Sequence, residues 1–131
     1  MVASKPRDLC ERTFLFACDI VRFCKDLGKV AGVPRQIAGQ LLRAGTSVGA
    51  NAEEAKAAYS RREFACKNNI VLREARESKS WLRVIAANDL ASKESTDPLL
   101  AEANELGGDL YRNCETCEGV RPAVEILKVE G

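Results

Sequence analysis

The stretch that decides the fold is QLLRAGTSVGANAEEAKAAYSRREF, residues 40–64. At about 100° per residue, its apolar side chains, together with Ile37 just before it, fall on one narrow face of a helix. A second row, here called the polar stripe, lies directly beside that face and consists of Gln40, Arg43, Ser47, Asn51 and Glu54. A polar row along the edge of an apolar face indicates hydrogen bonding at a contact between helices.

The same stretch contains the start of the next helix. Ser60-Arg61-Arg62-Glu63 has the spacing of a capping box, in which the Ser60 hydroxyl accepts from the Glu63 amide and the Glu63 side chain reaches back. Gly45 and Gly49 stand inside the preceding helix, where each glycine costs about 1 kcal/mol relative to alanine. Either a neighbouring helix approaches the backbone closely at these glycines, or the helix is locally weak there.

These residues resemble the signature of the four-helix-bundle proteins encoded in intervening sequences of bacterial large-subunit rRNA genes. The resemblance rests first on Ser47-Val48-x-x-Asn51-x-x-Glu54 and Ser60-x-x-Glu63-Phe64. It continues in the helices on either side, in Asp8-Leu9, Arg12-Thr13 and Leu72-x-Glu74-Ala75-x-Glu77-x-x-x-Trp81-Leu82. The resemblance covers residues 7–118 and implies an antiparallel four-helix protomer that forms rings of five. A related accessory protein of retroelements is a basic ring that binds nucleic acid.

Apolar periodicity and cap signals predict four helices, over residues 6–27, 34–58, 61–90 and 98–117. Pro6 and Pro34 suit first helical turns, and Asp97 before Pro98 reads as an N-cap followed by proline at the first helical position. Short connections make neighbouring helices antiparallel. We therefore expect an all-α, up-down-up-down four-helix bundle over residues 1–118, followed by a mobile tail over residues 119–131.

The expected core faces follow from the same periodicity. In the first helix the inward residues are Leu9, Thr13, Phe16, Ala17, Ile20, Phe23, Cys24 and Leu27. In the third they are Phe64, Val71, Ala75, Ser78, Leu82, Ile85 and Ala86. Phe14 and Val21 widen the apolar face of the first helix beyond what one core covers. Exposed apolar area of this kind marks an interface, which predicts a homo-oligomer.

Charge is unevenly distributed although the formal net charge is only +1. Residues 34–83 contain ten Lys/Arg against five Asp/Glu, and residues 92–131 contain four against nine. The basic part could bind RNA, or it could face the acidic fourth helix within or between protomers. The candidate nucleic-acid-binding residues are Arg61, Arg62, Arg73, Arg76 and Arg83. Arg73 can also pair with Glu77 four residues on. The near-neutral balance, and the expected absence of exposed aromatic residues among the basic ones, argue against RNA.

The cysteines and carboxylates give little sign of chemistry. Cys114-x-x-Cys117 continues the apolar row Leu99, Ala103, Leu106 and Leu110, so packing is favoured over a metal or redox site. The chain has no histidine, which excludes Ser-His-Asp and Cys-His arrangements. Glu54, Glu74 and Glu77 could converge as a carboxylate metal site, but Glu54 or Glu74 paired with Arg43 at a half-buried contact is favoured. We expect no catalytic residues, metal or cofactor.

Taken together, the sequence predicts a non-enzymatic scaffold or adaptor that assembles with itself. The alternative is an RNA-binding accessory protein that uses the basic face of the third helix. No apolar run approaches the roughly 18 residues of a membrane span, and the chain starts without a signal peptide, so we expect a cytoplasmic protein. Its expected partners are copies of itself, as a pentamer according to the resemblance, and RNA or another protein. A membrane or a small-molecule substrate is not expected.

Overall fold

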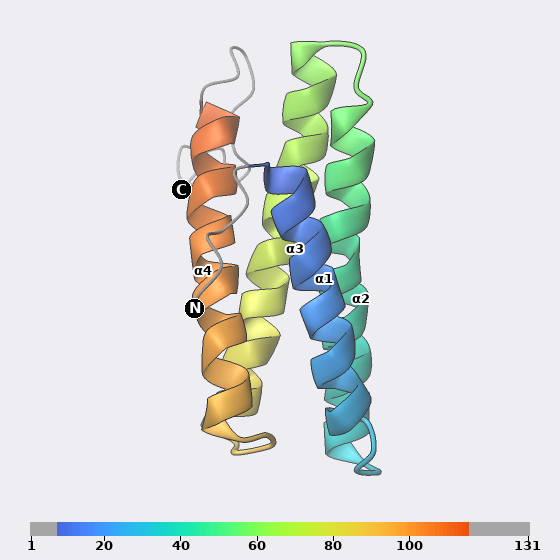
Figure 1. Ribbon diagram of the computed structural model, residues 1–131, viewed down its shortest axis with the longest axis vertical. Coiled ribbons are helices and arrows are strands. Elements are labelled where there is room, and N and C mark those ends of the chain that lie inside the picture. The colour runs from blue at the N-terminus through green and yellow to red at the C-terminus, as the bar shows by residue number, and fades with distance from the viewer. Residues whose placement is uncertain (1–7, 116–131) are drawn as a thin grey trace, which may run out of the picture.

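In the computed structural model, residues 8–115 are described and form four helices (Figure 1). They are α1 (Leu9–Leu27), α2 (Val33–Lys56), α3 (Arg61–Ala87) and α4 (Lys93–Glu115). Successive helices run in opposite directions and lie side by side (Figure 1). Within residues 8–115 there is no strand. The predicted all-α, up-down-up-down bundle is confirmed, and no helix in this range is long and apolar enough to cross a membrane.

The core is aliphatic, as the composition requires. Each helix packs closely against its neighbours in sequence, and α4 returns to α1 with a looser contact. The four helices therefore surround one core in the order α1, α2, α3, α4, and the arrangement is most open between α1 and α4. The largest fully buried side chains come from all four helices: Phe16, Ile20, Leu41, Leu72, Leu82, Ile85, Leu106, Leu110, Val48 and Val71.

Several helix bounds differ from the prediction, and α2 ends at Lys56, two residues before the expected Ala58. Asp8 is extended and its carboxylate accepts from the Cys10 amide, so α1 starts at Leu9; the expected start, Pro6, lies outside the described residues. At the end of α3, Asp89 adopts a φ of 53°, which stops the helix at Ala87 before Leu90. Ala86 was wrongly predicted to point inward: it is exposed in the last turn, where the chain leaves for α4.

The start of α4 was also placed wrongly. The helix begins at Lys93, because the Ser92 hydroxyl accepts from the Ser95 amide at 3.2 Å and thereby caps an extra turn. Pro98 thus lies inside α4, where it has no backbone N–H to donate. The expected end of this helix at Cys117 and the tail over residues 119–131 lie outside the described residues.

The glycines of α2 explain how α1 and α2 pack. A Cβ atom at Gly45 would lie 2.6 Å from Cγ2 and 2.8 Å from Cγ1 of Ile20, which is fully buried. A Cβ at Gly49 would lie 3.3 Å from the Thr13 carbonyl oxygen and 3.7 Å from the Cα of Phe14. A Cβ would collide with Ile20 at Gly45, and at Gly49 it would be tight enough to require a small shift of α1. Of the two alternatives, close approach of a neighbouring helix is therefore the correct one.

Contacts between α1 and α4 are much less extensive than those between the other neighbouring pairs. Besides the shared core, the two helices are joined by Arg12, whose side chain is only 11% exposed. Its Nη2 donates to Glu102 Oε1 and its Nη1 to Asp109 Oδ2, both at 2.6 Å. Glu105 adds a third carboxylate at 3.9 Å. One guanidinium on α1 thus holds a row of carboxylates on α4.

We expect Gly45→Ala to destabilise the fold although alanine favours helix. The overpacking against Ile20 should cost about 1–3 kcal/mol and exceed the gain of about 1 kcal/mol in helix propensity. Gly39→Ala is the matched control, because nothing lies within 4 Å of a Cβ there; it should raise stability by up to about 1 kcal/mol. Urea unfolding measures both. Equal stabilisation by the two substitutions would contradict the close approach.

Arg12→Met should lower the free energy of unfolding by about 1–3 kcal/mol, because it keeps the aliphatic stem but removes two charge-assisted hydrogen bonds to α4. Lys29→Met is the control. Lys29 also pairs with a carboxylate, that of Asp26, but both side chains are at least 70% exposed, so a change under about 0.5 kcal/mol is expected. If the two variants unfold at the same denaturant concentration, Arg12 does not close the bundle.

Candidate functional site

The polar stripe lies on the outer surface between α2 and α3. Arg43 of α2 is hydrogen-bonded to Glu77 of α3 and approaches Glu74 Oε2 at 3.6 Å. Trp81 donates from Nε1 to Glu77 Oε2 at 3.1 Å. The expected pairing of Arg43 with Glu74 is thus present. Glu77 is a second partner of Arg43, so it is engaged away from Arg73.

The remaining members of the stripe are arranged differently. Asn51 donates to the Ser47 carbonyl oxygen at 2.8 Å, within its own helix, and both residues are half-buried. Glu54 does not pair with Arg43; its partner is Lys67 of α3, at 3.3 Å. Glu54 is therefore separated from Glu74 and Glu77. Across residues 8–115, no three His, Cys, Asp or Glu side chains are grouped in a way that could hold a metal ion.

The described cysteines are free thiols, and two of them have raised pKa values. Cys24 is buried in the core, and burial raises the pKa of its thiol to about 11. The Cys10 thiol donates to Glu53 Oε2 at 2.9 Å, and this hydrogen bond, together with desolvation, raises its pKa to about 11. Cys114 is buried at the end of the α4 apolar row. Cys117 lies outside the described residues.

All five candidate arginines, Arg61, Arg62, Arg73, Arg76 and Arg83, are exposed on α3. They are spread along the helix from its first turn to near its last. Arg76 lies over the ring of Tyr111 on α4, 5.9 Å from its centroid. Arg83 lines a shallow hollow of about 430 Å³ between α3 and α4, together with Lys79 and Asp97.

One expectation about this basic region was wrong. Tyr59, in the turn between α2 and α3, is 97% exposed, and the exposed Lys56, Arg61 and Arg62 are its neighbours in sequence. An exposed aromatic ring does therefore stand among basic residues. The exposure of Tyr59 could not be predicted from its position, because a residue that directly precedes the capping box could equally have packed against α3.

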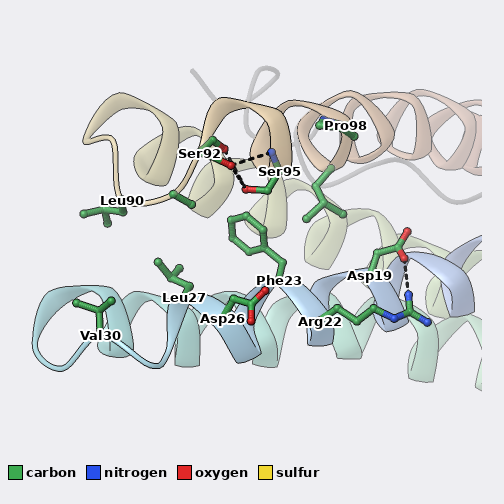
Figure 2. Close-up of a pocket in the computed structure, with 12 residues that line it drawn as sticks. Asp19, Arg22, Phe23, Asp26, Leu27, Val30, Leu90, Ser92, Ser95 and Pro98 are labelled. Atoms are coloured by element: carbon green, nitrogen blue, oxygen red, sulfur yellow. Dashed lines mark hydrogen bonds and ion pairs between the residues drawn. The ribbon is translucent and has the colours of Figure 1, made fainter.

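A groove of about 610 Å³ opens between α1 and the start of α4 (Figure 2). Phe23 and Leu27 of α1 point into it, and Leu90, from the turn before α4, lies at its end (Figure 2). Asp19 and Asp26 stand along its edge on α1. The groove was not predicted, because it exists only where α1 and α4 separate below the contacts of Arg12.

The apolar surplus predicted for α1 is on the outside of the bundle. Phe14 is 57% and Val21 44% exposed, and they lie seven residues apart, hence on the same side of the helix. Leu42 of α2, 39% exposed, stands three residues before Gly45, along the edge where α2 meets α1. We call Phe14, Val21 and Leu42 the apolar strip.

The comparisons with known proteins agree with the resemblance found in the sequence. The family model described as 23S rRNA-intervening sequence protein matches residues 7–112. A crystal structure of a protein of unknown function from the S23 ribosomal protein family, from Bacteroides thetaiotaomicron, is 32% identical and has a TM-score of 0.76. The similarity covers 83% of this chain and 100% of that one. No curated protein matches. Residues 7–112 thus place this chain in the 23S rRNA-intervening sequence protein family, to which it belongs.

Proposed function

We propose that this protein is a non-enzymatic, cytoplasmic scaffold or adaptor that works as a homo-oligomeric ring. The apolar strip carries the proposal. Phe14 and Val21 expose much of their apolar area on the side of α1 that adjoins α2, and such surfaces on soluble proteins mark contacts with a partner. The family resemblance implies five copies in the ring.

The alternative uses of the structure are less well supported. The groove between α1 and α4 has the volume of a ligand site, but its side chains include no group of converging catalytic residues. Cys10 and Cys24 have raised pKa values and are therefore poor nucleophiles near neutral pH. A surface that binds further copies explains the exposed apolar residues of α1, which neither of these features does.

Light scattering coupled to size-exclusion chromatography tests the assembly. At micromolar concentration we expect a mass that is a multiple of the 14.3 kDa chain, with five copies as the expected number. A monomer would refute the proposal. A dimer would remove the ring, and any other multiple would remove only the number five.

RNA binding is a second candidate, which the exposure of Tyr59 beside Lys56, Arg61 and Arg62 favours. The exposed phenol ring of Tyr59 can stack on an RNA base, and the neighbouring basic side chains can neutralise phosphates. The spread of Arg73, Arg76 and Arg83 along α3 extends the basic surface away from this turn.

Gel shifts with single-stranded RNA at increasing salt test this candidate. Affinity should fall steeply with salt, since phosphate neutralisation releases counterions. Tyr59→Ala should weaken binding about tenfold, by the loss of one stacking contact of about 1–3 kcal/mol. Arg73→Glu with Arg76→Glu should weaken it further, and Lys25→Glu, an exposed lysine of α1, is the control. The absence of a shift at low salt, or equal shifts for all variants, would eliminate RNA binding.

A further inference from the structure

We infer that the outer surface between α2 and α3 is the docking site for the apolar strip of the next copy. We call this surface the receptor seam, and it consists of Arg43, Lys67, Ile70, Glu74, Glu77 and Trp81. The inference rests on the proposed self-assembly and specifies which two surfaces meet. The contact is head-to-tail: each copy offers its α1 to one neighbour and its receptor seam to the other.

A closed ring of more than two copies needs two different surfaces on each protomer. The order of the helices around the bundle supplies them. The apolar strip lies at the outer α1 corner and along the α1–α2 side, and the receptor seam lies along the adjacent α2–α3 side. Surfaces that face roughly 90° to 135° apart close a ring of about four to eight copies, a range that includes five. Surfaces on opposite sides would give an open filament.

The receptor seam has the apolar groups that such a contact needs. Ile70 is 37% exposed and stands three residues after Lys67 and four before Glu74, so it lies on the same side of α3 as both. Trp81 is half-buried in the same row, with its indole nitrogen already satisfied by Glu77. Its ring edge therefore offers apolar area without leaving a polar atom unpaired.

The heights of the two surfaces along the bundle match. The contact of Phe14 with Gly49, and that of Ile20 with Gly45, set α1 against α2. The pairs Glu54–Lys67 and Arg43–Glu77 set α2 against α3. These contacts place Phe14 of α1 and Ile70 of α3 at about the same height along the bundle axis. All copies of a cyclic ring point the same way, so residues at equal height meet when the ring axis is parallel to the bundle.

Charges match at the same register. Glu11, exposed on α1 next to the apolar strip, lies at the level of Lys67. Arg22, whose side chain is 74% exposed, lies at the level of Glu77. The neighbouring Glu74 is held by Arg43, whose Nη1 lies 3.6 Å from its Oε2. An acidic and a basic residue of α1 thus flank the strip opposite a basic and an acidic residue of the seam.

A mixing experiment tests the pairing. Phe14→Glu disables the strip and leaves the seam intact, whereas Ile70→Glu does the reverse. Each variant alone should be a monomer by light scattering. Mixed in equal amounts, they should form a species of twice the chain mass, because the intact seam of one binds the intact strip of the other. Val30→Glu is the control: Val30 is 56% exposed in the turn after α1, and this variant should assemble like the unmodified protein.

The outcomes separate this inference from the proposed function. A monomeric unmodified protein refutes the assembly itself. An assembled protein that tolerates Ile70→Glu, or two monomeric variants that do not combine, overturns the receptor seam and leaves self-assembly standing. Circular dichroism checks that the variants are folded. If either is not, a charge exchange decides: Glu11→Lys and Lys67→Glu should each make the assembly dissociate at several-fold higher concentration, and together they should restore it. Equal weakening by the double variant would overturn the pairing.

Discussion

The fit of Ile20 into the space left by Gly45 determines what the rest of α1 can do. A single Cβ at Gly45 would collide with two atoms of that side chain, so the glycine fixes the register of α1 on α2. In this register Thr13 and Ile20 face α2 and the core. Phe14 and Val21, each the next residue along the helix, are turned about 100° away and lie on the outside. The exposed apolar strip thus follows from the register of α1 on α2.

The opposite side of α1 is held by charge. Arg12 reaches the α4 carboxylates near one end of the bundle, and no comparable contact of α1 and α4 is present toward the other end, where the groove lined by Phe23 and Leu27 opens. An ion pair of this kind, with the arginine buried and the carboxylates partly exposed, adds less stability than an apolar contact of the same size but fixes one arrangement of the helices. Part of the negative charge of residues 92–131 is therefore neutralised inside the protomer. Glu102 and Asp109 pair with Arg12 of α1 and not with the basic residues of α3.

The fold could be predicted because its signals are local. Ser60 accepts from the Glu63 amide at 3.1 Å, as the capping box predicts, and the Glu63 side chain reaches back one residue further, to the Tyr59 amide at 2.9 Å. The wrong start of α4 also has a local cause. Asp97-Pro98 is a stronger start signal than Ser92, but the extra turn buries Thr96, and the helix begins at Lys93. What the sequence could not supply were contacts between helices. The periodicity of a single helix predicts neither the ion pair of Arg12 with Glu102 nor that of Glu54 with Lys67.

The shared element in all of these contacts is α2. Its glycines set the position of α1, and its polar stripe sets the position of α3 through Arg43, Asn51 being hydrogen-bonded within the helix itself. The positions of the apolar strip and of the receptor seam are therefore both set by α2, one continuous helix of 24 residues. A rigid helix keeps the angle between two surfaces constant, and in a cyclic assembly that angle determines how many copies close the ring. Residues 47–54, in which the family resemblance was found, belong to this helix. A change in the geometry of this segment would change the angle between the two surfaces and hence the closure of a ring.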